Sequence, residues 1–136
     1  MKNVVVTIPD RQRLGDLLSN LEMQCFGDPR ARELLQCKLE EAEAKSARAI
    51  SNARVTMNSK VVLFEPATGQ RRTCTLVYPD DRDLYENSVG VLETLGVRLL
   101  GRRVGDVFEV PEGKRKRRFV IESLRYQPEL SGAEHL

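Results

Sequence analysis

The 136-residue sequence predicts an α+β fold, in which a short antiparallel helical hairpin precedes a small antiparallel β-sheet with one short helix. Two observations predict this class. Apolar residues recur at helical spacing within residues 1–54, whereas from about Val55 the sequence changes to β-branched residues separated by turn dipeptides. Because the helices come before the strands without βαβ alternation, the order indicates α+β rather than a parallel α/β sheet. We therefore expect two units, residues 1–54 and residues 55–136.

The first predicted helix begins at Thr7, whose hydroxyl group can cap free backbone N–H groups of the first turn. Pro9 in that turn and Asp10, three residues after Thr7, are typical of a helix start. A stripe of leucines at positions i, i+3, i+4 and i+7 then predicts one apolar face over roughly four turns. These leucines are Leu14, Leu17, Leu18 and Leu21.

The second predicted helix follows a break at Gly27, with Asp28 as its cap and Pro29 at its first position. The apolar residues at helical spacing are Leu35, Leu39, Ala42 and Ala49. The charged residues between them, from Lys38 to Arg48, are expected on a solvent-exposed face. Two amphipathic helices joined by a short loop form an antiparallel hairpin. At about 1.5 Å per residue, each helix is some 20–35 Å long.

The sheet is expected from short runs of β-branched and aromatic residues bounded by turn signals. Residues 66–69 and 111–113 contain Pro and Gly and are predicted turns, and residues 79–83 are a predicted acidic loop. Residues 94–100 carry the apolar pattern of a brief helix, which Gly101 terminates. The predicted strands are residues 60–65, 72–78, 88–92, 105–110 and 118–124.

The composition excludes several classes of protein. Lys and Arg number 22 and Asp and Glu number 20, so the formal net charge of +2 is too small for a nucleic-acid binder held by bulk charge. Hydrophobic residues make up 40%, which is ordinary for a globular chain. The chain has neither the pattern of a signal peptide nor a run of the roughly 18 apolar residues that span a bilayer. We therefore expect a cytoplasmic protein without a membrane partner.

Residues for enzymatic chemistry are scarce. The only histidine, His135, lies near the end of the chain, which makes a Ser/His/Asp or Cys/His apparatus improbable. The three cysteines, Cys25, Cys37 and Cys74, contain no CxxC pair, and phosphate-binding glycine loops are absent. We therefore expect no catalytic residue, no cofactor and no metal site.

The basic run Lys114–Arg118 is the strongest charge feature of the sequence. Successive residues of a strand face opposite sides, so Lys114, Lys116 and Arg118 are expected to share one exposed face. One interpretation is that this face contacts phosphate groups of a nucleic acid or of a complex that carries one. The other is that a charged edge strand prevents sheets from associating. The sequence leaves both open.

Residues 95–106, Leu95-Gly96-Val97-Arg98-Leu99-Leu100-Gly101-Arg102-Arg103-Val104-Gly105-Asp106, resemble the SPxGxALLGxxxGD block of the GreA/GreB transcript cleavage factors, with Val89 preceding it. More closely, the chain resembles the short members of this family, the regulators of nucleoside diphosphate kinase (Rnk). Further motifs of that resemblance lie in residues 55–61, 75–79 and 126–129, so that it covers most of residues 55–129.

The resemblance implies a coiled-coil hairpin followed by an FKBP-like sheet domain that docks on RNA polymerase at the rim of its secondary channel. The partner-binding residues that it implies are Asp28, Leu95, Gly96, Leu99, Leu100, Arg102 and Asp106. The other interpretation of Leu95, Leu99 and Leu100 is that they are core residues of the short helix. The hairpin is shorter than in the Gre factors, and Asp28 has no acidic neighbour to help chelate a metal. Glu93-Thr94 also replaces the Ser-Pro of the block. We therefore expect a non-enzymatic regulator that competes with Gre factors for polymerase without cleaving transcripts.

Two other functions remain open at this stage. An FKBP-like fold is compatible with a peptidyl-prolyl isomerase, although a chain without Trp and with 5% aromatic residues has few side chains for an aromatic-lined pocket. Direct binding of nucleic acid through the Lys114–Arg118 run is the second alternative, while in the preferred hypothesis any contact with nucleic acid is indirect.

Overall fold

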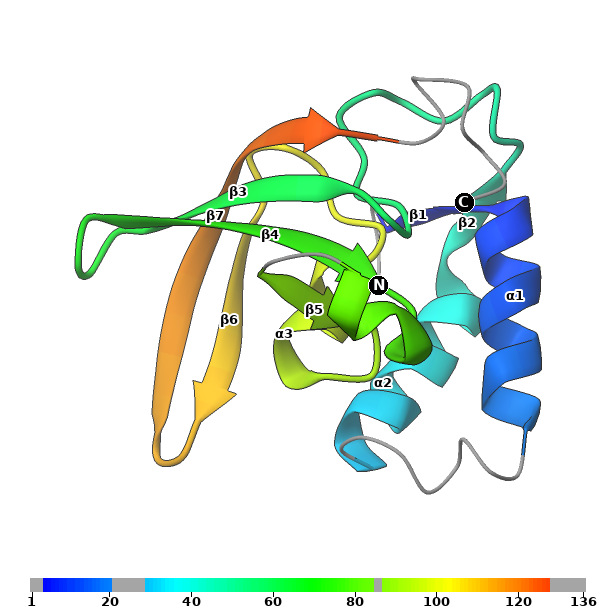
Figure 1. Ribbon diagram of the computed structural model, residues 1–136, viewed down its shortest axis with the longest axis horizontal. Helices are drawn as coiled ribbons and strands as arrows, with labels where there is room; N and C mark the ends of the chain where they lie inside the picture. The colour runs from blue at the N-terminus through cyan, green and yellow to red at the C-terminus, as the bar shows by residue number, and fades with distance from the viewer. Residues whose placement is uncertain (1–3, 21–28, 85–86, 128–136) are drawn as a thin grey trace.

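A computed structural model describes residues 4–20, 29–84 and 87–127 of the protein (Figure 1). Within these residues the fold is α+β, as predicted. Two helices, α1 and α2, pack against each other at one end of the molecule, and a curled five-stranded sheet with the short helix α3 forms the other end. No helix in the described ranges is long and apolar enough to cross a membrane.

Helix α1 (Ile8–Ser19) begins where the sequence predicts it. The Thr7 hydroxyl oxygen accepts a hydrogen bond of 3.1 Å from the backbone N–H of Asp10, so the predicted cap is confirmed. The helix ends at Asn20, and Leu21 of the predicted stripe lies outside the described residues. A short strand that the sequence did not indicate, β1 (Val5–Thr7), runs directly into α1.

Helix α2 (Pro29–Glu41) begins at Pro29 as predicted, but the prediction that it continues to Ala49 is wrong. The chain turns at Ala42 into strand β2 (Glu43–Lys45), which pairs in parallel with β1. The buried backbone N–H and C=O groups of β1 need hydrogen-bond partners, and β2 supplies them. For example, Glu43 N–H donates to Val4 O at 3.1 Å. Apolar spacing carries no signal for such a pairing.

The five-stranded sheet has the order β5-β4-β3-β7-β6. It is antiparallel except between β4 and β5, which are parallel, so the prediction of a fully antiparallel sheet is wrong at this pair. The chain leaves β4, passes through a 3₁₀ helix η2 (Pro79–Leu84), predicted as a loop, and returns to start β5 in the same direction as β4. The strands are β3 (Lys60–Glu65), β4 (Gln70–Val77), β5 (Ser88–Gly90), β6 (Val107–Glu112) and β7 (Arg115–Tyr126).

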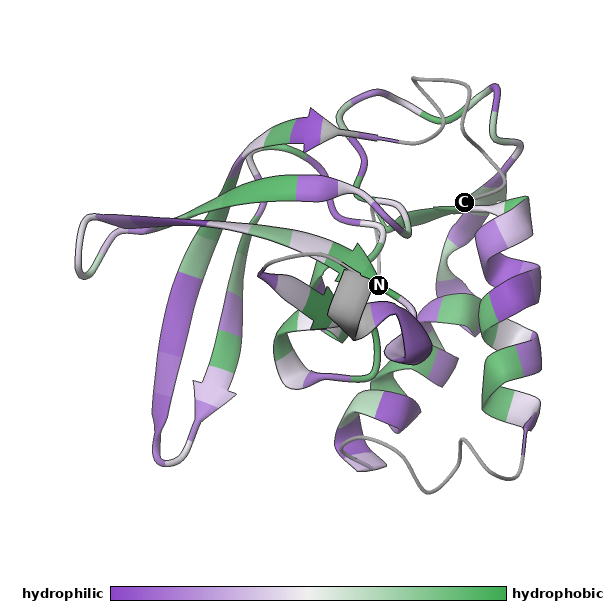
Figure 2. Ribbon diagram, viewed as in Figure 1, coloured by the Kyte–Doolittle hydropathy of each residue, from purple (hydrophilic) through white to green (hydrophobic). Residues whose placement is uncertain are grey.

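Strands β6 and β7 extend beyond the rest of the sheet. The pairing of β3 with β7 ends at Phe64↔Val120, whereas β6 and β7 continue to pair as far as Glu112↔Arg115. Residues 108–112 and 115–119, with the turn between them, therefore form a two-stranded projection, the β6–β7 ribbon, at the lower left of Figure 1. Figure 2 shows that β7 changes from largely hydrophobic near the body of the molecule to hydrophilic toward the turn.

One hydrophobic core joins both ends of the molecule. Leu14 of α1 and Leu35 of α2 are fully buried in the same cluster as Leu63 and Ile121 of the sheet. A polar contact supports this packing, because the Asp10 carboxylate accepts a hydrogen bond of 3.0 Å from the backbone N–H of Met57. The division of the chain into two units, residues 1–54 and residues 55–136, thus remains a prediction.

Candidate partner-binding site

The short helix α3 (Thr94–Leu99) lies in backbone contact with β5. A Cβ atom at position 96 would lie 1.9 Å from the carbonyl oxygen of Gly90, so only Gly96 allows this approach. Before the helix, the Glu93 carboxylate accepts a hydrogen bond from the Gly90 N–H. After it, Gly101 adopts a φ of +79°, in agreement with its predicted role in ending the helix. These contacts fix the position of α3 on the sheet.

Three of the predicted partner-binding residues are not at the surface. Leu99 and Leu100 have no solvent-exposed surface and belong to the hydrophobic core, and Gly96 is buried against β5. Leu99 and Leu100 are thus core residues, which is the other interpretation that the sequence left open, and direct contact with a partner is corrected for them and for Gly96. An apolar helix face is most stable against the core, and these residues act by holding α3 in place.

Leu95, by contrast, is half-buried at the mouth of a groove of about 430 Å³ between α3 and the inner face of strands β6 and β7. We call it the α3 groove. Its apolar lining consists of Val89, Leu92, Leu95, Val110, Pro111 and Phe119. Its charged lining consists of Arg72, Glu93, Glu112 and Arg117. An apolar floor with charges of both signs around it is typical of a surface that binds another protein.

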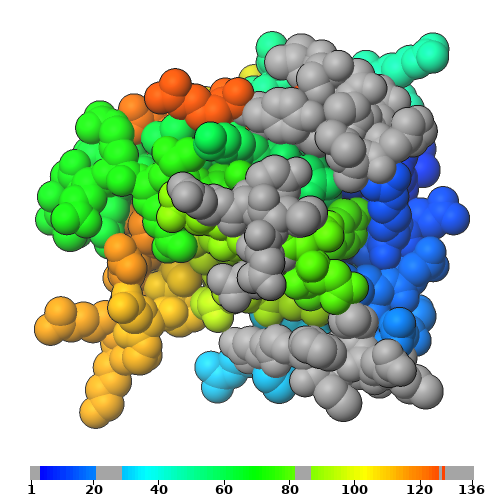
Figure 3. Space-filling model, viewed as in Figure 1, coloured from blue at the N-terminus to red at the C-terminus, as the bar shows by residue number. Residues whose placement is uncertain are grey.

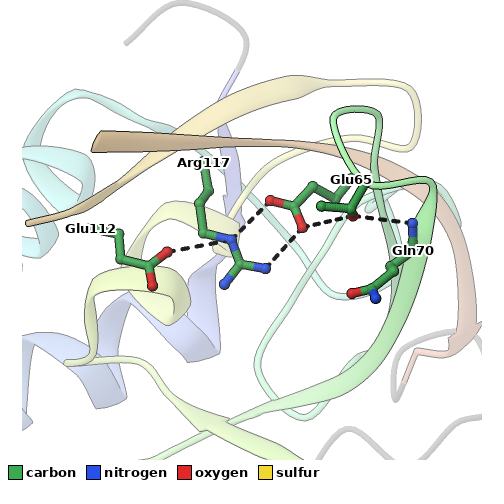
Figure 4. Close-up of polar contacts among 5 residues, drawn as sticks. Glu65, Gln70, Glu112 and Arg117 are labelled. Atoms are coloured by element: carbon green, nitrogen blue, oxygen red, sulfur yellow. Dashed lines mark hydrogen bonds and ion pairs between the residues drawn. The ribbon is translucent and has the colours of Figure 1, made fainter. Parts of the chain in front are cut away.

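Arg117 is held rigidly in one wall of the α3 groove (Figure 4). Its guanidinium group donates two hydrogen bonds of 2.9 Å to the carboxylate of Glu65 and lies 3.5 Å from the carboxylate of Glu112. The same group lies 5.1 Å from the ring centroid of Phe119. Such a bidentate pair with a ring contact keeps the long side chain in one geometry.

Glu65 is the buried partner of this arginine, with 6% of its surface exposed. The hydrogen bonds from Arg117 lower the pKa of Glu65 below its ordinary value, and a hydrogen bond of 3.1 Å from the Thr68 hydroxyl group acts in the same direction, while burial opposes both. Glu65 therefore remains ionised near neutral pH, and the wall of the groove keeps its shape. Neither Arg117 nor Glu65 was predicted as a site residue, because they are 52 positions apart.

Arg102 and Asp106 are partly exposed, but neither of them lines the α3 groove. The Arg102 side chain donates to the carbonyl of Arg98 at 3.1 Å, and the Asp106 carboxylate accepts from the backbone N–H of Arg103 at 2.9 Å. Asp106 thus stabilises the turn that leads into β6. Asp28 lies outside the described residues.

The basic run is divided between two faces of the β6–β7 ribbon. Arg117 lines the α3 groove, whereas Lys116 and Arg118 line a hollow of about 480 Å³ on the opposite face. All three also border a third hollow of about 750 Å³ between the ribbon and the turn that joins β3 to β4. Lys114 lies in the turn. Residues 115–119 of β7 pair with β6 but not with β3, so the other edge of β7 is unpaired there, and the interpretation of the run as a charged edge strand stays compatible with its position. The two faces follow from strand alternation, as expected.

Lys38 lies at the junction between α2 and α3 and is buried, contrary to the prediction from the sequence. It was expected on a solvent-exposed face, but only 2% of its surface is exposed, and its ammonium group donates to the carbonyl oxygens of Arg98 at 3.2 Å and Leu100 at 2.8 Å. Burial, together with the nearby charges of Arg102 and Arg98, lowers the pKa of Lys38 to about 7. Its spacing of three residues from Leu35 was the signal that places it on the buried stripe.

Comparison with known proteins identifies the family. Residues 50–126 match the family model described as "Transcription elongation factor, GreA/GreB, C-term". The protein belongs to the GreA/GreB family. Among its relatives in this family is the "Regulator of nucleoside diphosphate kinase" of Escherichia coli (strain K12), which is 33% identical over 131 residues that cover 95% of this chain and 93% of the relative.

Two further members of the GreA/GreB family are similar over most of the chain. "Transcription elongation factor GreA" of Syntrophus aciditrophicus (strain SB) is 26% identical over 121 residues, covering 84% of this chain and 74% of the relative. The solved structure "Prokaryotic transcription elongation factor GreA/GreB from Nitrosomonas europaea" is 30% identical and superimposes with a TM-score of 0.77 over 93% of this chain and 100% of that one. These relatives are named as transcription factors or as a regulator, and none of them as a peptidyl-prolyl isomerase.

The GreA/GreB family model covers all five strands of the sheet and α3, and therefore the whole α3 groove. The resemblance inferred from residues 95–106 is thus confirmed at the level of the family. Within the described residues, no group of three or more His, Cys, Asp or Glu side chains is placed to hold a metal ion.

Proposed function

We propose that this protein is a transcription regulator of the Rnk type, which binds RNA polymerase near the secondary channel and does not cleave transcripts. The observation that carries the proposal is the end-to-end similarity to the Escherichia coli regulator, which spans 95% of this chain and 93% of the relative. The similarity to the GreA/GreB transcription elongation factors supports RNA polymerase as the partner. A polymerase partner would place the protein in the cytoplasm.

The α3 groove is the proposed surface for polymerase. Leu95 offers a half-buried apolar side chain at its mouth, and Arg72 and Glu112 offer exposed charges of opposite sign on its rim. A protein helix that carries an apolar residue flanked by charges is complementary to this arrangement. We propose that Arg102 and Asp106 support the same surface by stabilising the loop between α3 and β6. We also propose that Asp28 contacts polymerase.

The proposed lack of cleavage rests on the helices. We propose that α1 and α2 form a short coiled-coil hairpin on an FKBP-like sheet domain. With 12 and 13 residues, they reach about 18 and 20 Å at a rise of about 1.5 Å per residue. Metal-assisted cleavage needs carboxylates that share one metal ion. Asp28 is flanked by Gly27 and Pro29, so neither of its neighbours in the sequence supplies a second carboxylate. The protein would therefore occupy the site of a Gre factor without performing its chemistry.

A competition experiment tests this function. Labelled protein bound to core RNA polymerase should be displaced by increasing concentrations of GreA, because both would use the same site. The protein should leave the RNA of backtracked complexes intact under conditions where GreA shortens it. Simultaneous binding of both proteins, or RNA cleavage that is lost in the Asp28→Ala variant, would contradict the proposal.

A further inference from the structure

The tip of the β6–β7 ribbon carries cationic side chains that have no acidic partner. Lys114, Arg115 and Lys116 are exposed, and within the described part of the chain their side chains form no ion pair. Arg117 and Arg118, farther from the turn, are paired with glutamates instead. Ion pairs with the residues that the structure describes therefore leave the positive charge at the tip unneutralised.

The ribbon concentrates the positive charge of the whole protein. Residues 107–118 contain five Lys or Arg and two Glu, while the complete chain has a formal net charge of only +2, so the remaining residues carry a net charge of −1. The orange side chains near the turn project from the body of the molecule in Figure 3. A polyanion that approaches the protein is therefore attracted to this projection first.

We infer that the β6–β7 ribbon binds the phosphate backbone of duplex DNA without sequence preference. The major groove of DNA admits a two-stranded β-ribbon, and the unpaired cations lie at its turn and on both of its faces, where they can reach phosphates of either strand. Single-stranded nucleic acid is bound largely by stacking on aromatic rings. Phe108 and Phe119, the aromatic residues of the ribbon, are buried, with 4% and 3% of their surface exposed, and offer no such platform.

This binding does not depend on the proposed contact with polymerase. Arg117 and Phe119 line the α3 groove, whereas Lys116 and Arg118 line the hollow on the opposite face of the ribbon. A duplex held at the tip therefore leaves Leu95 accessible. Three phosphate contacts give weak, salt-dependent binding, which a second contact on the same complex would strengthen.

Fluorescence anisotropy of a labelled 20-base-pair duplex with the full chain tests the inference. With three phosphates neutralised, the affinity should fall about 40-fold between 50 and 200 mM salt. The variant Lys114→Gln/Arg115→Gln/Lys116→Gln should bind at least about 10-fold more weakly at 50 mM salt and lose most of this salt dependence. Single-stranded RNA of the same length should bind more weakly than the duplex.

The matched control removes three exposed cations elsewhere, in the variant Arg11→Gln/Arg48→Gln/Lys60→Gln. It changes the net charge by the same amount and should keep the affinity within about 3-fold of the original. Equal loss in both variants would assign the binding to net charge and overturn the inference. Absence of binding to the duplex at 50 mM salt, or tighter binding of the single-stranded RNA, would overturn it as well. The salt dependence of the unchanged protein provides a readout that needs no variant.

Discussion

Lys38 illustrates how a single residue can be misread from a charge pattern. Its side chain satisfies two carbonyl oxygens at the end of α3, Arg98 O and Leu100 O, that no N–H group of the helix can reach. It therefore links α2 to the helix that borders the groove. Among the described residues no carboxylate compensates the buried charge, and Arg102 and Arg98 instead disfavour it. Folding consequently favours the neutral amine.

The first prediction is that the free energy of unfolding rises with pH through Lys38. Its pKa is about 7 in the folded protein and 10.5 in an ordinary lysine, so between these values the unfolded chain binds more protons than the folded one. Stability then increases with pH in this window. Between pH 7 and 9 the gain should be about 2 kcal/mol larger in the original protein than in Lys38→Met, as measured by urea denaturation.

The control for this prediction is Lys60→Met, which replaces an exposed lysine. It should retain the pH dependence of the original protein. If the curves of Lys38→Met and the original protein ran parallel between pH 7 and 9, the assignment of the effect to Lys38 would be wrong.

At the scale of elements, the sequence predicts what local chemistry determines. The start of α1 follows from the Thr7 hydroxyl group, and the start of α2 at Pro29 follows from the fixed backbone of proline. The end of α2 and the parallel pairing of β1 with β2 depend on residues about 38 positions apart, such as Val5 and Glu43. Similarly, the parallel pairing of β4 with β5 depends on the packing of η2 against both strands. Contacts between distant residues leave no periodic signal in the chain.

The second prediction concerns the packing of α3 on β5. In Gly96→Ala, the new methyl group would overlap the carbonyl oxygen of Gly90, so the helix must move. The variant should lose about 3 kcal/mol of unfolding free energy in urea denaturation. Gly15→Ala in α1 is the matched control, because its methyl group would meet nothing within 4 Å, and it should gain about 0.5–1 kcal/mol. A Gly96→Ala protein as stable as the original would contradict the close approach.

At the scale of the whole molecule, the sheet separates two surfaces of different chemistry. The inner face carries the α3 groove with Leu95 and Arg117, and the outer face of the ribbon carries Lys116 and Arg118. The small net charge of +2 is thus unevenly distributed, because the ribbon is strongly basic while the remaining residues together carry a net charge of −1. Such a distribution orients a small protein on a large charged partner.

The candidate site was only partly accessible from the sequence. The motif in residues 95–106 indicates the family, and Leu95 is at the surface as a contact residue must be. The motif cannot indicate which of its members are buried, and it gives equal weight to Leu99 and Leu100, which form the core. Arg117 was assigned to the basic run, because its pairing with Glu65 requires the folded sheet.

We propose that the α3 groove binds RNA polymerase, and an equilibrium binding measurement with core polymerase tests this proposal most directly. Leu95→Asp places a charge in the apolar mouth of the groove. Arg72→Glu reverses an exposed charge on the rim of the groove, and this exposed substitution leaves the core intact. Val107→Asp is the control, at a residue that is 53% exposed and outside the groove. Far-ultraviolet circular dichroism of each variant verifies its fold.

We expect Leu95→Asp to weaken binding at least about 30-fold, because a central contact worth about 2 kcal/mol is lost. Arg72→Glu should weaken binding in the same direction, and Val107→Asp should leave it within about 3-fold of the original affinity. Binding of folded Leu95→Asp and Arg72→Glu as tight as that of the original protein would contradict the claim.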